Sequence, residues 1–255
     1  MSELISIVTS LYNYARFIPD LAESIVAQTW DNWEWIIVDD ASTDNPNRVL
    51  YPYLQKYGDR IKVLNWGLNR GYSACKNDGI RSSRGNYIVM IDADDMLTSK
   101  SLELRYEALV LTDKFWVHGE VIVKNGKQCS EESRNWKRRF RQKLKREGKD
   151  LTKEYHHRLI HAQSVMMRRE LHKKLGLYDP KLRFSSDNEM WRRIIRFGYI
   201  PVHIEDFVAV YRVHPDRMAR SDYKRKRKNK VKKQLILDVE RRFTEGINSE
   251  NTELW

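Results

Sequence analysis

The sequence contains few cysteines, no long apolar run and no low-complexity linker. Its 255 residues include only Cys75 and Cys129, too few for a disulfide framework or a zinc cluster. Two reduced thiols are typical of an intracellular protein. No stretch of about eighteen apolar residues occurs, which argues against a membrane-spanning helix. The first residues lack the basic start and cleavage site of a signal peptide, so we expect a cytoplasmic protein.

Glycine is absent from the loop that follows the first predicted strand. Residues 9–14 read TSLYNY. Nucleotidyltransferases with an α/β sheet usually have a glycine-rich phosphate loop after their first strand, because glycine lets the backbone approach a phosphate closely. The sequence therefore disfavours that class of enzyme.

Acidic residues are scarce in two segments, and these segments account for the net charge of +12. Residues 134–147 and 224–233 together hold sixteen of the 47 Lys and Arg residues and one of the 35 acids, so the rest of the chain is nearly balanced. Both segments are predicted to be helical. One interpretation is a protein that binds nucleic acid or another polyanion through these helices. No helix-turn-helix, zinc or RNA-binding motif accompanies them, which argues against nucleic acid as a partner. An anionic membrane or an acidic glycan would bind to the same positive charge without such a motif.

Strand-like and helix-like segments alternate through the first half of the chain. The predicted buried strands of this half cover residues 4–9, 35–38, 61–64 and 87–91. Such alternation predicts an α/β fold with a mostly parallel, Rossmann-like central sheet flanked by helices.

The second half is less regular. Short strands are predicted at 115–118, 120–123 and 164–167, with one or two more between 202 and 211. A turn is predicted at Asn125-Gly126. A helix that carries Met190 and Trp191 ends near Gly198.

Two predicted strands end in aspartates. Asp39-Asp40 follow the strand at 35–38, and Asp92-Ala93-Asp94-Asp95 follow the strand at 87–91. Exposed turns also favour Asp, but ligands of open α/β sheets bind beyond the carboxyl ends of the strands, so two clusters at one edge indicate a site. An Asp-Ala-Asp sequence there suits a hard divalent cation such as Mn²⁺ or Mg²⁺, which would share its ligands with substrate phosphates.

These motifs resemble those of the family 2 glycosyltransferases, which have a GT-A fold. The resemblance is strong over residues 4–112 and looser over 160–220. The stretches that carry it are SIVTSLYN at 6–13, SIVAQT at 24–29, WEWIIVDDASTD at 33–44, NRG at 69–71, KN at 76–77 and DADD at 92–95. The resemblance implies a metal-dependent, inverting enzyme that moves a sugar from a nucleotide-sugar to an acceptor hydroxyl.

The resemblance also implies which residues bind the nucleotide. The matching positions are Thr9, Leu11, Tyr12, Asn13, Asp40, Asn69, Lys76, Asp92 and Ala93. Asp40 corresponds to an aspartate that typically binds the uracil base, so UDP is the expected nucleotide, with dTDP and GDP as alternatives. Asp92 is expected near the ribose. The family often has Arg where this chain has Lys76.

Two further motifs imply the general base and the metal ligands. Residues 185–193, SSDNEMWRR, resemble the family segment that supplies the base, so Asp187 is the expected catalytic residue. A helix N-cap is the alternative role for Asp187, and Glu189 is the reserve candidate.

Residues 211–215, YRVHP, resemble a segment whose histidine completes the metal shell, so the expected ligands are Asp94 and His214, with a structural role as the alternative for His214. His161 has a weaker claim to the acceptor side.

The expected organisation follows from these assignments. Residues 1–220 would form one glycosyltransferase domain, with a nucleotide-sugar-binding half at 1–112 and an acceptor-binding half at 113–220, and residues 221–255 would form a basic helical extension. The expected partners are the donor and an acceptor that is a glycan or a lipid-linked or protein-linked saccharide, as in polysaccharide biosynthesis. The basic segments would allow peripheral contact with the inner face of a membrane.

Overall fold

The computed structural model describes residues 2–150, 155–182 and 185–217. Its strands are β1 (Ile5–Leu11), β2 (Trp33–Asp39), β3 (Ile61–Asn65), β4 (Tyr87–Met90), β5 (Met96–Leu97), β6 (Trp116–Asn125), β7 (Gln128–Ser130), β8 (Val165–Arg168) and β9 (Val202–Val213). Its α-helices are α1 (Ile18–Val26), α2 (Pro46–Tyr57), α3 (Tyr72–Ser82), α4 (Ser101–Thr112), α5 (Glu132–Arg146), α6 (Arg169–Leu175) and α7 (Ser186–Arg196). The predicted extension at 221–255, including the basic segment 224–233, lies outside the described residues.

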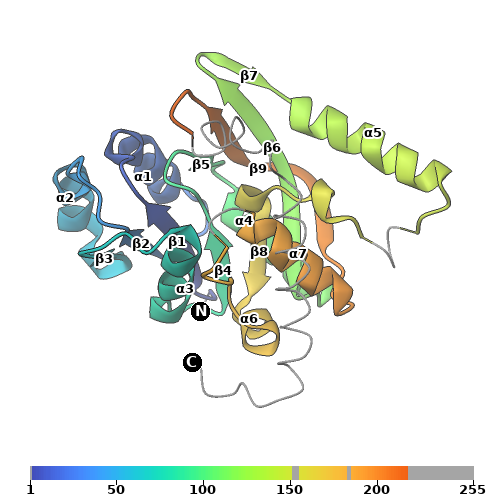
Figure 1. Cartoon of the computed structure of the whole chain (residues 1–255), viewed down its shortest axis with the longest axis horizontal. Coiled ribbons are helices and arrows are strands. Elements are labelled where there is room, and N and C mark those ends of the chain that lie inside the picture. Colours follow the sequence, from blue (N-terminus) through green and yellow to red (C-terminus); the bar gives the residue numbers. More distant parts are fainter. Residues whose placement is uncertain (1, 151–154, 183–184, 218–255) are drawn as a thin grey trace.

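All the strands belong to one mixed sheet (Figure 1). Its order is β3-β2-β1-β4-β8-β6-β9-β5, and β7 pairs with β6. In the first half, β1 lies between β2 and β4 and is parallel to both. In the second half, β8 runs antiparallel to β4 and β6, while β9 is parallel to β6. No helix in the described part of the chain is long and apolar enough to cross a membrane.

The four strands predicted in the first half are confirmed to within one or two residues at their ends. Most of their positions are apolar, because both faces of the sheet are covered. One face packs against α1, α2 and α4, with a core that includes Ile7, Trp35 and Leu102. The other face packs against α3, α6 and α7, with a core that includes Val8 and Trp191.

The prediction of two separate strands at 115–118 and 120–123 is wrong, because one continuous strand, β6, covers both. The register against β9 shifts on either side of Glu120. Gly119 makes this irregularity possible, since a Cβ there would lie only 2.9 Å from the backbone oxygen of Asp206. The predicted turn at Asn125-Gly126 is confirmed, with Gly126 at φ +58° between β6 and β7.

Helix α3 lies unusually close to the sheet, and this closeness fixes its side chains over the site. A Cβ at Gly79 would lie 2.3 Å from Cγ1 of Val8, so only glycine permits the observed distance between α3 and β1. The first turn of α3 is thereby held at the carboxyl edge of the parallel strands, where ligands bind in folds of this kind.

Candidate functional site

The two predicted aspartate clusters meet at one edge of the sheet. Because β1 pairs in parallel with both β2 and β4, the ends of these two strands lie on either side of the end of β1. Asp39 is the last residue of β2, and Asp92 follows β4 after one intervening residue. The loops that carry both clusters therefore border one region, as the sequence predicts.

Asp40 holds the loop at 69–71 in place. Its Oδ1 accepts a hydrogen bond from the backbone N–H of Arg70 at 2.6 Å, and its Oδ2 accepts one from the backbone N–H of Gly71 at 2.9 Å. The side chain of Asn69 donates to the backbone oxygen of Asp40 at 3.2 Å. The structure thus brings together two of the predicted nucleotide-binding residues, Asp40 and Asn69. Cys75 also donates to this carboxylate, which is buried and accepts hydrogen bonds on both oxygens.

The side chains of Thr9, Leu11 and Ala93 point into the protein core. All three are buried. Thr9 and Leu11 share a face of β1 with Ile7, because side chains alternate along a strand, and Oγ1 of Thr9 accepts a hydrogen bond from Nε1 of Trp35 at 2.9 Å. These residues were expected to bind the nucleotide, but the structure leaves only their backbone for that role.

Asn13, just after β1, holds the loop at 42–43 that follows β2. It has a left-handed backbone, with φ 56°. Its Oδ1 accepts a hydrogen bond from the backbone N–H of Thr43 at 2.8 Å, and its own N–H donates to Oγ of Ser42 at 3.0 Å. The neighbouring Tyr12 is 48% exposed. Of the predicted residues after β1, Tyr12 therefore has an exposed side chain, whereas the side chain of Asn13 positions the loop at 42–43.

Asp92 lies at the centre of a hydrogen-bonded cluster. Its Oδ1 accepts a hydrogen bond from the hydroxyl of Tyr72 and its Oδ2 accepts one from Nε2 of Gln163, both at 2.5 Å. Burial raises the pKa of Asp92 to about 6; Lys76 opposes that rise, and Asp94 and Asp187 add to it. No motif in the sequence points to Tyr72 or Gln163, which reach this carboxylate only through the fold.

The acids after β4 fit a divalent cation. Asp92, Asp94 and Asp95 each offer one oxygen, and these oxygens lie within 4.8 Å of one another. Oδ2 of Asp95 is buried without a hydrogen-bond partner among the described residues. Burial raises the pKa of this carboxyl well above its usual range, and Asp94 and Asp92 add to the effect. A hard cation would bind the unpaired oxygen of Asp95 and offset the repulsion between the three carboxylates.

His214 lies beside this group of acids. Its Nε2 is 2.9 Å from Oδ2 of Asp94, and both side chains are largely buried. Strand β9 delivers the histidine, because Arg212 near its end donates its backbone N–H to Oδ1 of Asp95 at 2.8 Å. The two residues expected to bind the metal, Asp94 and His214, are thus brought together from positions 120 residues apart.

Helix α7 brings Asp187 to the same site. Lys76 on α3 donates a hydrogen bond from Nζ to Oδ1 of Asp187, whose side chain is 21% exposed. Ser185 is the N-cap of α7, so the alternative role of Asp187 as the N-cap is wrong. Asp187 lies in the first turn, with its side chain directed to Lys76.

Glu189, the reserve candidate for the base, has a structural role. It is fully buried, and its Oε1 accepts a hydrogen bond from Nε of Arg193 at 2.8 Å. Arg193 in turn donates to the backbone oxygen of Leu177 at 2.9 Å, tying α7 to the segment after α6. His161 is half-buried, and this burial, with Lys137 adding to it, lowers its pKa to about 3, so its imidazole is neutral. Its ring lies against Tyr211 with the ring centres 4.5 Å apart.

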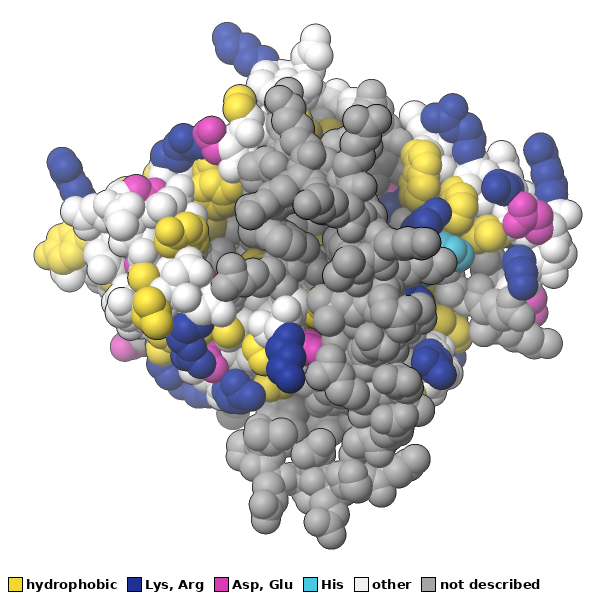
Figure 2. Space-filling model, in the orientation of Figure 1, with side chains coloured by type: hydrophobic (Ala, Val, Ile, Leu, Met, Phe, Trp, Pro, Cys, Tyr) yellow, Lys and Arg dark blue, Asp and Glu magenta, His cyan; other side chains and the backbone are white. Residues whose placement is uncertain are grey.

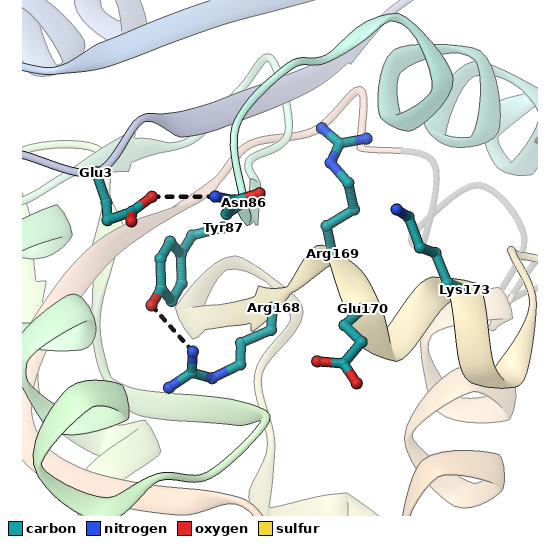
Figure 3. Close-up of a pocket in the computed structure, with 7 residues that line it drawn as sticks. All are labelled: Glu3, Asn86, Tyr87, Arg168, Arg169, Glu170 and Lys173. Atoms are coloured by element: carbon teal, nitrogen blue, oxygen red, sulfur yellow. Dashed lines mark hydrogen bonds between the residues drawn. The ribbon is translucent and has the colours of Figure 1, made fainter.

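A separate hollow lies at the opposite edge of the sheet, where β4 begins (Figure 3). Its lining includes Tyr87, Arg168, Arg169 and Lys173. Arg168 donates to the hydroxyl of Tyr87 at 3.1 Å, and Arg169 donates to the backbone oxygen of Gly85 at 2.7 Å. These arginines fasten β8 and α6 to the first half of the chain. The hollow lies away from the carboxyl ends of the parallel strands, so it is not the predicted site.

Sequence comparisons agree with this architecture. The model of the glycosyl transferase family 2 matches residues 6–176, more than half of the chain. An uncharacterised glycosyltransferase of Methanocaldococcus jannaschii is 32% identical over 225 residues, which cover 84% of this chain and 72% of that protein. Glycosyltransferase GlyG of Streptococcus pneumoniae is 34% identical over 125 residues, which cover 49% of this chain and 40% of GlyG.

Solved structures share the fold. S. aureus TarS in complex with UDP superposes with a TM-score of 0.65 at 17% identity, covering 83% of this chain and 61% of the other. A mannosyltransferase from Pyrobaculum calidifontis in complex with GDP-Man and Mn²⁺ also gives 0.65, at 19% identity, covering 86% and 59%. The chain therefore spans less than two thirds of the length of GlyG and of both these structures. The predicted GT-A fold is confirmed, and the chain belongs to glycosyl transferase family 2.

Proposed function

We propose that this protein transfers a sugar from a nucleotide-sugar to an acceptor hydroxyl with inversion at the sugar carbon, in a reaction that requires Mn²⁺ or Mg²⁺. The observation that carries the proposal is the convergence of two carboxylate groups at one edge of the sheet. Asp92, Asp94 and Asp95 lie close enough together that they could hold a cation. Asp187 reaches the same region from α7 through its contact with Lys76.

The donor would lie between the loop at 69–71 and the acids after β4. Asp40 and Asn69 would contact it from one side, and Asp92 with the backbone of Ala93 from the other. UDP is the nucleotide that we propose, supported by the likeness to TarS, which was solved with UDP and with UDP-GlcNAc. GDP is the alternative, since the similar mannosyltransferase was solved with GDP-Man.

The metal would be held by Asp94 and His214, with the neighbouring acids contributing charge or ligands. When bound, the cation offsets the negative charge that grows on the departing nucleoside diphosphate. Asp94 and His214 suit this role because carboxylate oxygen and neutral imidazole are both acceptable ligands of Mn²⁺.

Asp187 would act as the general base. An acceptor hydroxyl is a weak nucleophile, and a carboxylate within hydrogen-bond distance takes its proton as the oxygen attacks. Lys76 engages Oδ1 of Asp187, and the side chain remains partly exposed, so its other oxygen is available to an acceptor. A single base opposite the departing diphosphate gives one displacement and therefore inversion.

The acceptor that we propose is a glycan or a lipid-linked or protein-linked saccharide, as in polysaccharide biosynthesis. The residues of the second half that are described, between 113 and 217, would shape its site. An enzyme acting on a lipid-linked acceptor would work at the inner face of a membrane.

Calorimetric titration tests the donor half of the proposal. UDP, GDP, dTDP and CDP are each titrated with Mn²⁺ and then with EDTA. We expect one nucleoside diphosphate to bind in the presence of the metal and to lose its binding in EDTA. If none binds under either condition, the proposed donor site is wrong.

Substitution of the base tests the chemical half. Asp187→Asn should reduce transfer by at least about a hundredfold, because general-base catalysis contributes on the order of 10²–10⁴, while metal-dependent UDP binding stays nearly unchanged. Asp113→Asn is a matched control, because that side chain is fully exposed at the end of α4. Full transfer by the Asp187 variant would disprove the assignment.

A further inference from the structure

Helix α5 lies at the outer side of the molecule, away from α1 and α2 (Figure 1). It follows the β6–β7 hairpin and packs against β6. Its sequence contains most of the first basic segment found in the chain. The predicted helix at 134–147 is confirmed, and the structure separates its cations into an inner and an outer set.

The inner set is neutralised within the protein. Lys137 is 2% exposed, and its Nζ lies 3.3 Å from Oε2 of the buried Glu120. Arg141 lies 3.4 Å from Oε1 of the same carboxylate. Leu144 is buried on this side of the helix as well. Two of the cations that gave the segment its charge therefore fasten the helix to the sheet and are not available to a partner.

The outer set remains in solvent. Its members are the exposed residues Arg138, Arg139, Lys143, Lys145 and Arg146. Helical spacing places them away from the side that carries Lys137 and Leu144. Within the described ranges only Lys143 has a carboxylate partner, Glu147 at 3.7 Å. Trp136 is 45% exposed, stacks on Phe140 with ring centres 5.2 Å apart, and lies at the rim of this surface.

Figure 2 shows Lys and Arg side chains standing out from the side of the molecule on which Figure 1 places α5, with hydrophobic side chains between them. The surface is the convex side of a helix. A single nucleic-acid strand is usually bound in a positively charged groove in which aromatic rings stack on successive bases. The convex basic surface with a tryptophan at its rim instead suits a flat anionic layer, because indole rings favour the membrane–water interface.

We propose that the outer face of α5, formed by Arg138, Arg139, Lys143, Lys145 and Arg146 with Trp136 at its rim, binds an anionic lipid bilayer. Each cation near such a surface strengthens binding about fivefold, the equivalent of ~1 kcal/mol. Five together would hold the protein at the membrane without a spanning segment. This inference does not depend on the proposed transfer reaction.

Sedimentation of the full chain with lipid vesicles tests the proposal. We expect binding to vesicles of phosphatidylcholine with phosphatidylglycerol and none to pure phosphatidylcholine. Replacing the five cations of the outer face with Gln should weaken binding by on the order of a thousandfold. The matched control replaces five exposed lysines elsewhere, and these are Lys56, Lys62, Lys100, Lys114 and Lys173.

The control removes the same charge from the molecule, so a difference between the two variants isolates the position of the charge. Equal binding by both variants, or equal binding to both kinds of vesicle, would overturn the proposal. So would a preference for a 30-nucleotide DNA strand over anionic vesicles that is lost in the α5 variant, because the face would then be a nucleic-acid site. Unchanged melting temperatures would show that both variants are folded.

Lys76 carries a second, independent inference. Its side chain is 2% exposed, and Nζ lies 4.0 Å from the ring centre of Tyr72 and 4.8 Å from that of Tyr178. The ammonium group is therefore enclosed by two rings and directed to Asp187. A nucleotide could contact it only after these side chains had moved, although Lys76 was expected to bind the nucleotide.

We infer that Lys76 is a positioning residue for Asp187, an inference that rests on the proposed role of Asp187 as the base. Helix α3 is fixed on β1 by the close approach at Gly79, so Nζ of Lys76 is a fixed donor. Its hydrogen bond to Oδ1 orients the carboxylate, and the second oxygen is left to face the acceptor. Small errors in the position of a catalytic group cost up to about a hundredfold in rate.

The test compares Lys76→Met and Lys76→Arg with the unchanged enzyme. Met retains the unbranched apolar side chain as far as Cε and removes the ammonium group with its hydrogen bond. We expect kcat to fall by at least about tenfold, the Kd of UDP with Mn²⁺ to change less than about twofold, and Arg to restore part of the rate. A weaker UDP affinity with an unchanged kcat would overturn the inference and support a nucleotide contact.

The Asp187→Asn variant is measured beside these two. If it is inactive while Lys76→Met keeps its full kcat, the positioning role is wrong and the base assignment stands. If Asp187→Asn is fully active, the base assignment itself fails. The two failures are therefore distinguishable.

Discussion

At the scale of single residues, the direction in which a side chain points determines whether it can contact a ligand at this site. Thr9 and Asp92 both lie at the carboxyl edge of the sheet, but Thr9 points inward to Trp35 and Asp92 is held among Tyr72, Gln163 and the other acids. Alternation along β1 explains the orientation of Thr9, because Ile7 and Leu11 on the same face are core residues. A residue can thus match a motif by position and still contribute only its backbone to binding.

Thr9→Val tests this distinction. The substitution keeps the volume but removes the acceptor of the Trp35 N–H, which would be left buried without a partner. We expect the free energy of unfolding to fall by about 1–3 kcal/mol, while the Kd of UDP with Mn²⁺ changes by less than about twofold. Denaturant unfolding and calorimetry measure the two quantities. A large loss of affinity in a variant of normal stability would show that the hydroxyl does contact the nucleotide.

Much of the site could be predicted from the sequence, because several of its groups lie at the ends of recognisable strands. Asp40, Asp92 and Asp94 follow buried apolar runs, and parallel strands bring their ends to one edge. Gln163 could not be predicted in this way, because its contact with Asp92 depends on the antiparallel strand β8, which reaches the site only in the folded chain. The contact between Lys76 and Asp187 spans 111 residues and has no local signal.

At the scale of elements, α5 shows that a basic segment can be partly a core element. Burial alone would raise the pKa of Glu120; its hydrogen bond to His203 and the charges of Lys137 and Arg141 overcome that effect and hold the pKa at about 2. The carboxylate is therefore ionised and paired below α5. The periodicity of the segment predicted the helix, but its composition did not reveal which cations face inward.

Glu120→Gln tests the contribution of this buried pair to docking of α5. The variant leaves Lys137 buried without a charge partner, so we expect a loss of about 3 kcal/mol in the free energy of unfolding near pH 7. The folded pKa of about 2 lies below the ordinary value of 4.5, so the pair stabilises the protein above pH 4.5. That contribution is lost as the pH falls toward 2, and the difference between the two proteins should shrink over this range.

Glu170→Gln is the matched control for this measurement. Glu170 pairs with Lys174 at 3.0 Å on the surface of α6, with both side chains about half exposed, and its loss should cost less than about 1 kcal/mol. Denaturant unfolding between pH 3 and 7 measures all three proteins. A destabilisation by Glu120→Gln no larger than that of the control would show that apolar packing alone holds α5.

The strands could be predicted more fully than the connections between them. Mostly apolar runs of four or more residues locate β1 to β4, since strands covered on both faces have few polar positions. The continuous strand β6 was divided in the prediction because Gly119 interrupts its pattern, although this glycine serves a close approach to the backbone at Asp206. The sheet order also depends on antiparallel pairing by β8, for which the sequence holds no local pattern.

At the scale of the whole molecule, the site joins segments that are distant in the chain. The acids after β4, His214 after β9 and Asp187 on α7 meet at one edge, although Asp94 and His214 are 120 residues apart in the chain. A ligand bound there would contact both halves of the described structure. Its binding free energy must therefore appear as stability of the fold, because the unfolded chain has no such site.

Thermal unfolding with ligand tests this coupling. UDP and Mn²⁺ together at about a hundred times Kd should add about 2.7 kcal/mol, which for a chain of this size raises the melting temperature by roughly 5–10 °C. Asp94→Asn removes a proposed ligand of the cation, so its melting temperature should rise little under the same conditions, whereas the fully exposed Asp113→Asn should behave as the unchanged protein does. UDP with EDTA should have little effect. A similar rise in the Asp94 variant would mean that the carboxylate of Asp94 is not needed to hold the metal.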